Sequence, residues 1–352
     1  RHVLDLMEES ESREVRKLLE YAEDTAGGIM TPDVASVPQE APVSDALEAV
    51  ADVEDDTPFY YAYIVDEGGR LTGYVDIWEL LRCRDRSRPV RELMHGDPVA
   101  ADVGMDQEEV ARLMNQYDLS TVPVIDAAGR LLGRVTYDDV IDVMEEEASE
   151  DIFLLAGSDD AELESASPFR SCLVRLPWLF ITLLGGFVTS LILRQYHAQI
   201  TDVLVLASFV PVVLAMGGNT GIQSSTLIVR RIAVGGFEGR GALRVLLREV
   251  ATGAIMGLIC GAVIGFFARL VSLHSGADYD LAPYLMGSAV AVALFAAMTF
   301  AAVFGALVPM LLNRVKLDPA VAAGPFITIA NDIAALLIYF GVTFVLLQHF
   351  AA

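Results

Sequence analysis

The sequence predicts a multidomain protein: an α/β tandem repeat, an acidic connecting helix and an all-α membrane domain of five helices. Charge divides the chain, because residues 1–167 carry 41 Asp and Glu against 13 Lys and Arg, a net charge of −28. Residues 168–352 carry 7 Asp and Glu against 11 Lys and Arg, a net charge of +4, and hold five long apolar runs. Short apolar runs alternate with amphipathic ones in the acidic part, which is the α/β pattern. Long apolar runs such as those in residues 168–352 predict helices that cross a bilayer.

Residues 1–29 are predicted to be the last helices of an N-terminal helical domain, because Leu4 to Glu23 has helical apolar spacing but is too short for a core. The chain does not begin with Met, so we expect its true start to lie upstream. Cys83, Cys172 and Cys260 are dispersed, which predicts neither a disulfide framework nor a zinc site. The strong acidity argues against a nucleic-acid partner and in favour of cations.

Residues 30–144 repeat themselves, with Met30-Thr31-Pro32 matching Met94-His95-Gly96. Each copy is expected to form a helix, a strand, a turn with Gly, a second strand and a closing helix. The predicted helices are Val43–Val53 and Met105–Gln116, and the predicted strands are Tyr61–Val65, Leu71–Val75, Thr121–Ile125 and Leu131–Val135.

This order of elements resembles a tandem pair of CBS domains, a regulatory module that usually senses adenine nucleotides or ions. The second copy closes with the G-x-h-T-x-x-D pattern of such domains, from Gly133 to Asp139. In that interpretation Thr136 meets phosphate oxygens at a helix start and Asp139 accepts from ribose hydroxyls, so ATP is the expected ligand. The alternative is that Thr136 is only an N-cap and Asp139 a favourable first-turn carboxylate. The first copy reads GYVDIWE and lacks the Thr.

Residues 145–167 are predicted to connect the two halves, beginning within a run of carboxylates on the helix that follows Asp139. Carboxylates three and four residues apart on a helix share a face and repel one another, which favours a hard divalent cation bound through oxygen. A solvated acidic helix is the alternative. The run comprises Asp142, Glu145, Glu146, Glu147, Glu150 and Asp151.

Residues 168–352 are predicted to cross the membrane five times. The loop after the second span contains Arg230, Arg231, Arg240, Arg244 and Arg248. By the positive-inside rule this loop and the acidic domains are cytoplasmic, and the C-terminus is outside. Five is an odd number of spans, so a symmetric pore would need a second subunit. The five spans are Pro177–Leu193, Val203–Val229, Val250–Leu273, Ala282–Leu312 and Ala320–Leu347.

Three spans carry features beyond apolarity. Asp332 lies near the middle of the fifth span, which has no Lys or Arg, so a mobile cation is the best candidate for its partner. In the second span Asn219 and Gln223 fall one turn apart on one face; interhelical hydrogen bonding is the alternative to a pore role. Glycines at four-residue spacing from Gly253 to Gly265 predict close helix packing in the third span.

The combination of CBS-like repeats, an acidic helix, five spans, GGNTGIQSSTL and DPA…GP…NDIAALLIYF resembles the MgtE family of magnesium channels. The resemblance implies a homodimer with its pore on the dimer axis, lined by the second and fifth spans, and a plug helix that closes the pore when cytosolic Mg²⁺ is high. The chain departs from the family by lacking most of an N-terminal domain and by having Gly324 where a polar side chain can occur. By position, the pore aspartate is Asp332 and the sensor carboxylates are Asp139, Asp142, Glu147, Glu150 and Asp151.

The expected function is passive Mg²⁺ uptake that cytosolic Mg²⁺ inhibits, with Mg²⁺ and ATP as ligands. Hydrated Mg²⁺ would bind Asp332 from two subunits, because this ion gives up its waters reluctantly. Alternatives are a transporter of another divalent cation such as Mn²⁺ or Co²⁺, possibly coupled to another ion, and a CBS-regulated carrier of another solute. No acid and base pair predicts an enzyme. The other expected pore-lining residues are Asn331, Thr328, Gly324, Asn219 and Gln223.

Overall fold

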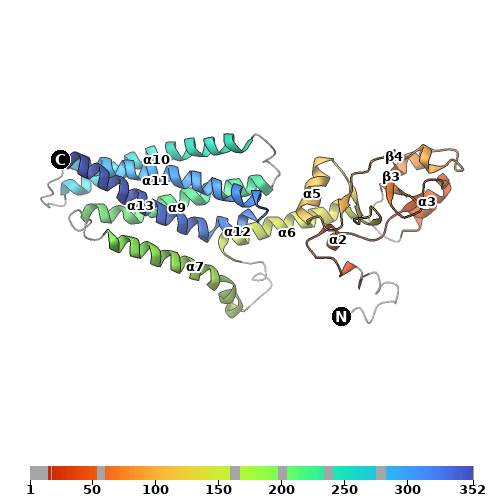
Figure 1. Ribbon diagram of the computed structural model, residues 1–352, viewed down its shortest axis with the longest axis horizontal. Coiled ribbons are helices and arrows are strands. Elements are labelled where there is room, and N and C mark those ends of the chain that lie inside the picture. Colours follow the sequence, from red (N-terminus) through yellow and green to blue (C-terminus); the bar gives the residue numbers. More distant parts are fainter. Residues whose placement is uncertain are drawn as a thin grey trace. The chain divides into compact units, whose positions relative to one another are not determined.

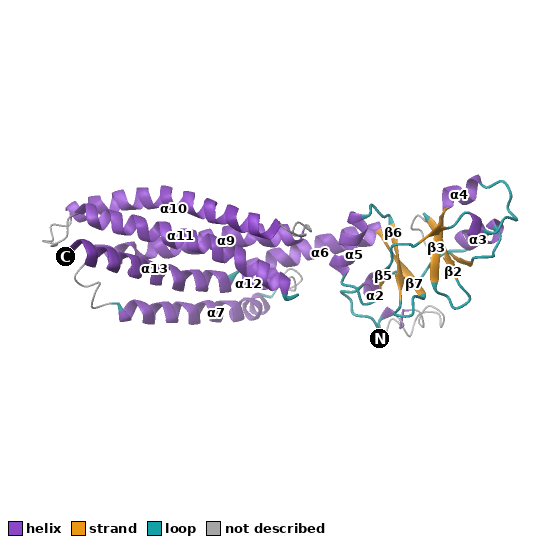
Figure 2. Cartoon of the chain, turned by 45° about the horizontal axis from the view of Figure 1, so that its top comes forward, coloured by secondary structure: helices purple, strands orange, loops and turns teal. Residues whose placement is uncertain are grey.

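A computed structural model describes residues 15–16, 18–53, 60–158, 167–196, 204–233, 241–274 and 283–351. The chain divides into two compact units, Arg1–Ala148 and Ser149–Ala352. Figure 2 shows strands in the first unit and long helices in the second, which confirms the predicted fold class. Most of the predicted helical segment Leu4–Glu23 lies outside the described residues, as do residues 159–166 of the predicted connecting segment.

The first copy of the repeat folds around a sheet in the order β1-β2-β3-β4, in which β4 is His95–Gly96. Strands β1 and β2 are parallel, whereas β2, β3 and β4 are antiparallel. The apolar residues that alternate along β2 and β3, such as Ile64 and Val75, meet Leu80 of α4 in one core. Its elements are β1 Ser36–Pro38, α3 Val43–Ala51, β2 Tyr61–Val65, β3 Leu71–Asp76, α4 Ile77–Arg82 and a short 3₁₀ turn at Val90–Glu92.

The second copy repeats this arrangement with the sheet order β5-β6-β7. Helix α5 begins at Gln107, two residues later than predicted, because the Asp106 side chain caps it by accepting from the Glu108 and Glu109 amides. The closing helix α6 continues without a break into the acidic run. Its elements are β5 Ala101–Asp102, α5 Gln107–Gln116, β6 Thr121–Ile125, β7 Leu131–Thr136 and α6 Tyr137–Ala156, with α2 Ala26–Ile29 contributing Ala26 to the same core.

The two copies exchange backbone at their first residues. Strand β4, His95–Gly96, begins the second copy but pairs with β3 of the first copy. Thr31 begins the first copy but exchanges two backbone hydrogen bonds with Arg134 of β7 (2.8 and 2.9 Å). A Cβ on Gly73 would lie 2.5 Å from the His95 carbonyl oxygen, and one on Gly133 would lie 2.6 Å from the Thr31 carbonyl oxygen. Each copy therefore needs a glycine where the other copy's strand crosses it.

The second unit contains five described helices that are long and apolar enough to cross a membrane. Figure 1 shows α9, α10, α11 and α13 packed alongside one another. Helix α11 contacts α9, α10 and α13, so it is the central helix of the unit. The five helices are α7 Pro168–Gln195, α9 Leu204–Ala233, α10 Gly241–His274, α11 Pro283–Arg314 and α13 Pro325–Ala351.

The glycine stripe of α10 is confirmed as a packing surface. A Cβ on Gly253 would lie 2.6 Å from Ala302 Cβ, and one on Gly261 would lie 2.6 Å from the Ala291 carbonyl oxygen. Both obstacles belong to α11, so these two helices approach as closely as their backbones allow.

The expectation of one continuous fifth helix from Ala320 is wrong at its start. A short helix α12, Pro319–Ala323, is followed by α13 from Pro325, and Gly324 between them has φ −86° and ψ −113°. Proline has no amide hydrogen to donate and restricts the residue before it to non-helical backbone, so the chain breaks at Gly324. Asp318 caps α12 by accepting from the Ala320 amide (2.8 Å).

Candidate functional site

The Asp332 carboxylate of α13 lies against a glycine face of α9. A Cβ on Gly218 would lie 3.4 Å from Asp332 Oδ1 and 3.8 Å from Thr328 Cγ2. Asp332 itself is partly exposed. Among the described residues none donates a hydrogen bond to this carboxylate or forms an ion pair with it. An acidic group thus lies beside glycine backbone, with its charge uncompensated by a described side chain.

Asn331 is buried one residue before Asp332. Its side chain is 1% exposed, and neither its amide nitrogen nor its amide oxygen has a hydrogen-bond partner among the described residues. The amide lies so close to Gly221 that a Cβ there would come within 1.7 Å of Nδ2. On its other side Gly221 meets Gly305 of α11, whose Cβ would lie 2.3 Å from the Gly221 carbonyl oxygen. The α9 backbone is therefore packed tightly between α11 and α13 at Gly221.

Asn219 and Gln223 do lie on one face of α9, but this face does not contain Gly218 and Gly221. They line a cavity of about 400 Å³ together with residues of α10 and α11, including Met256 of α10. The structure thus forms two separate groups from the predicted pore residues. Asp332, Asn331 and Thr328 lie toward the glycines of α9, whereas Asn219 and Gln223 lie toward α10.

The last turn of α6 is seated against the break between α12 and α13. Leu154 and Leu155 pack on a buried cluster of Val229, Ala320 and Ile327. A Cβ on Gly324 would lie 3.0 Å from the Leu155 carbonyl oxygen and 3.2 Å from that of Leu154. The absence of a side chain at Gly324 therefore permits this contact.

Two backbone hydrogen bonds fix the end of α6. The Ser158 amide donates to the Phe153 carbonyl (2.9 Å) and the Gly157 amide to the Leu154 carbonyl (3.1 Å). Gly157 has φ +70°, the left-handed conformation in which helices commonly end. A Cβ on Gly157 would lie 3.4 Å from Trp178 Cβ of α7, so the cap itself is packed.

The acidic run lies on one helix, α6, as predicted. The amide of Gln107 in α5 donates from Nε2 to Glu147 Oε1 (2.6 Å), which holds one of the carboxylates. Within the described part of the chain, no group of three or more His, Cys, Asp or Glu side chains is arranged to hold a metal ion. The sequence-predicted sensor carboxylates Asp139, Asp142, Glu147, Glu150 and Asp151 are thus not gathered into such a group by one chain alone.

Thr136 and Asp139 contact each other at the start of α6. The Thr136 amide donates to Asp139 Oδ2 (2.9 Å), and the Thr136 hydroxyl donates to the same oxygen. This pairing satisfies the helix start in the manner of a capping box. Across the strand pair, the hydroxyl of Thr121 is buried with no partner among the described residues. A polar ligand at this site would therefore find an unused hydroxyl beside the Thr136 and Asp139 pair.

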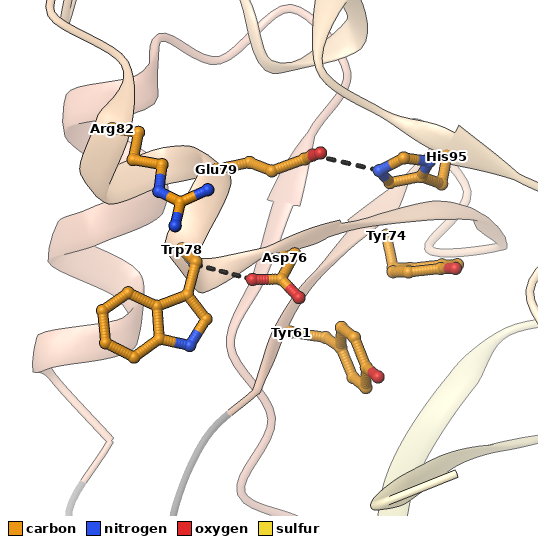
Figure 3. Close-up of a pocket in the computed structure, with 7 residues that line it drawn as sticks. All are labelled: Tyr61, Tyr74, Asp76, Trp78, Glu79, Arg82 and His95. Atoms are coloured by element: carbon orange, nitrogen blue, oxygen red, sulfur yellow. Dashed lines mark hydrogen bonds and ion pairs between the residues drawn. The ribbon is translucent and has the colours of Figure 1, made fainter. Parts of the chain in front are cut away.

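The first copy has a pocket of about 550 Å³ at the corresponding place (Figure 3). Asp76 occupies the position of Thr136, and its Oδ1 accepts from the Trp78 amide (2.7 Å). Glu79 occupies the position of Asp139 and pairs with His95 Nε2 (3.0 Å). A carboxylate already fills the helix start, so this pocket is unfavourable for phosphate. The lining residues are Tyr61, Tyr74, Asp76, Trp78, Glu79, Arg82 and His95.

Sequence reasoning missed Glu249, a buried carboxylate in α10. The predicted third span begins at Val250, which left Glu249 in a basic loop. The four-residue spacing of Gly253 to Gly265 extends back to Glu249 and Val245, and this is the signal that would have placed it on the buried face.

Comparison with known proteins identifies relatives of both units. A family model described as "MgtE: Divalent cation transporter" matches residues 210–342, and a CBS domain model matches residues 26–86 and 90–146. The chain is 40% identical to the magnesium transporter MgtE of Thermus thermophilus over 347 residues, which is 98% of this chain and 75% of the relative. It is 34% identical to the magnesium transporter MgtE of Bacillus subtilis over 342 residues, covering 96% and 73% respectively.

A solved structure titled "Crystal structure of the cytosolic domain of the Mg2+ channel MgtE in complex with ATP" is 42% identical to the matching part of the chain. The match covers 40% of this chain and 57% of that one, with a TM-score of 0.38.

Proposed function

The chain belongs to the MgtE family of magnesium transporters, and from this premise we propose that it forms a homodimeric channel for Mg²⁺ uptake. The family recognised in the sequence is confirmed, and its named members are transporters rather than enzymes. Five long apolar helices and the family support a location in a membrane.

The position of Asp332 is the observation that carries the proposal. A carboxylate in a membrane-spanning helix is costly unless it faces water or a cation. Asp332 lies against Gly218 of α9, where the missing side chain leaves the carboxylate beside helix backbone. Mg²⁺ keeps most of its waters, so a wide site with one charge from each subunit suits the hydrated ion. Thr328 and Gly324 extend the polar wall toward the cytoplasmic end, while Asn331 lies buried behind it.

A second subunit supplies what one chain lacks. Among the described residues, one chain offers a single carboxylate at the level of Asp332, and a two-fold axis beside α13 would place two carboxylates around one ion. The two groups of polar residues on α9 then have different roles: the Gly218 face borders the ion path, and Asn219 and Gln223 line the cavity toward α10.

Closure is proposed to depend on the acidic helix α6. The cytoplasmic half carries a net charge of −28, so two copies side by side repel each other until cations bind. Mg²⁺ bridging Asp139, Asp142, Glu147, Glu150 and Asp151 between subunits would cancel that repulsion. The end of α6 then stays seated at Gly324 and closes the entrance. Low cytosolic Mg²⁺ would release it.

ATP is proposed to bind the second CBS copy. Thr136 and Asp139 would exchange their mutual hydrogen bond for phosphate and ribose contacts, and the unused Thr121 hydroxyl adds a further donor. The carboxylate of Asp76 disfavours a second phosphate site in the first copy.

The CBS domains are proposed to lie in the cytoplasm and the C-terminus outside, in a cell membrane. Arg230 and Arg231 end α9, and Arg244 and Arg248 begin α10, so basic residues gather at one end of the bundle. Arg240 of the same loop lies outside the described residues.

Single-ion recordings test the proposal. Purified protein in planar bilayers should pass Mg²⁺ current with no gradient other than that of Mg²⁺, and cytoplasmic Mg²⁺ should close it. Mn²⁺ or Co²⁺ flux that needs a proton or sodium gradient, without Mg²⁺ current, would instead support the ion-coupled transporter of another divalent cation.

A further inference from the structure

Glu249 is a buried acidic residue that the proposed ion path does not use. Its side chain is 7% exposed, on the same face of α10 as Val245 and the glycine stripe. The buried residues of this helix are Val245, Glu249, Gly253, Gly257, Gly261, Gly265, Ala268 and Ser272, and Glu249 is the acidic one among them. A carboxylate at such a place is costly without a compensating partner.

The partner is on α9. The hydroxyl of Ser224, itself 2% exposed, donates to Glu249 Oε2 at 2.8 Å. This contact joins two helices that otherwise touch sparingly, because α10 packs chiefly along α11. This hydrogen bond therefore connects α10 to the part of α9 that leads to the proposed ion path.

Helices α10 and α11 form a rigid support for this connection. Gly253, which is one turn from Glu249, lies so close to α11 that a Cβ would come within 2.6 Å of Ala302 Cβ. Glu249 thus projects from a helix that has little freedom to slide or rotate.

The segment Met216–Thr226 of α9, by contrast, is a weak helix by composition. It contains three glycines and several Asn, Thr and Ser residues, all of which favour helix less than Ala or Leu does. Gly218 lies beside Asp332 and Gly221 beside Asn331, so any movement of this segment changes the surroundings of the proposed ion site. Ser224 is one turn beyond Gly221.

We propose that Glu249 is a positioning residue for the ion path: it holds Ser224 and thereby keeps Gly218 and Gly221 in place against α13. The inference rests on the proposed function for its effect on transport, but the mechanical part stands independently. The role requires a hydrogen-bond acceptor at position 249 and a donor at position 224. It does not require a negative charge, so Gln can replace Glu249 and Ala cannot.

Hydrogen exchange in the purified, lipid-reconstituted protein tests the mechanical part without any transport. Glu249→Ala and Ser224→Ala should each raise exchange of the Gly217–Ser225 amides by about fivefold, and the double variant should raise it no further. Glu249→Gln should stay within about twofold of wild type. The matched control is Ser225→Ala, because this neighbouring hydroxyl is equally buried and has no partner among the described residues.

Uptake measurements on the same variants test the functional part. Glu249→Ala and Ser224→Ala should raise the Mg²⁺ concentration for half-maximal uptake by about threefold or more, with Glu249→Gln and Ser225→Ala near wild type. Additive effects in the double variant, or a Glu249→Gln variant as impaired as Glu249→Ala, would overturn the inference. If Glu249→Ala does not fold, the comparison of Ser224→Ala with its control Ser225→Ala still tests the inference. If the variants show the exchange coupling but the wild-type protein passes no Mg²⁺, the proposed function is rejected and the connection between Glu249 and Ser224 stands.

Discussion

Replacing Gly324 with Ala perturbs the seat of α6 directly. The new Cβ would lie 3.0 and 3.2 Å from two carbonyl oxygens of α6, closer than the 3.4 Å at which ordinary contact begins. Both obstacles are backbone atoms of a capped helix end, so rotating a side chain cannot relieve the clash. The end of α6 must retreat by a few tenths of an ångström.

Overpacking of this kind costs about 1–3 kcal/mol, and only the seated arrangement bears that cost. Since 1.4 kcal/mol corresponds to a factor of ten, the ratio of seated to released α6 ends should fall by roughly 5- to 140-fold in each subunit. If each subunit takes up two Mg²⁺ ions jointly as it closes, the half-closing Mg²⁺ concentration should rise by the square root of that factor, roughly 2- to 12-fold.

The assay is the steady-state current at graded cytoplasmic Mg²⁺, with open-channel conductance recorded in the same traces. Gly341→Ala is the matched control, because Gly341 lies on α13, the helix that follows Gly324, and a Cβ there meets nothing within 4 Å. We expect Gly324→Ala to close only at higher Mg²⁺, with conductance changed little. A Gly324→Ala channel that closes at the wild-type Mg²⁺ concentration would refute the proposal that the seated α6 is the gate.

Three further predictions concern ions and nucleotide. Asp332→Ala should abolish Mg²⁺ uptake while the protein stays folded and assembled, and wild-type flux in a well-folded variant would remove Asp332 from the pore. Thr136→Ala should weaken ATP binding to the purified chain by about fivefold in calorimetry, whereas no heat from wild type at millimolar ATP would leave only the capping role. Neutralising Glu147, Glu150 and Asp151 together should move closure to higher Mg²⁺ at unchanged conductance; unchanged closure would make this part of α6 a solvated connector.

Local patterns predicted most of the soluble fold. The predicted strands Tyr61–Val65 and Thr121–Ile125 coincide with β2 and β6 at both ends, because a short apolar run followed by a turn with glycine is sufficient to define them. The predicted helix boundaries were wrong where a single side chain determines where a helix begins or ends. Asp106 delays α5 by capping it, and Pro325 breaks the fifth span at Gly324, a signal that was present but outweighed by apolarity.

The candidate site was less accessible to sequence reasoning, because it depends on contacts between distant segments. Asp332 could be found from charge alone. The close packing of Gly221 against Asn331 and Gly305 is a tertiary contact, and no local sequence pattern predicts it. Glu249 was missed since hydropathy ends a span at the first charge, whereas burial here follows the four-residue spacing of the helix face.

The first residues of each CBS copy pair with the backbone of the other copy, so neither copy completes its own sheet alone. A chain cut before Met94 would leave β3 with an open hydrogen-bonding edge, because His95 and Gly96 come from the other copy. The other fragment would in turn lose Thr31 from beside Arg134. Such edges recruit further strands, so each half expressed alone should aggregate or form a swapped dimer with itself.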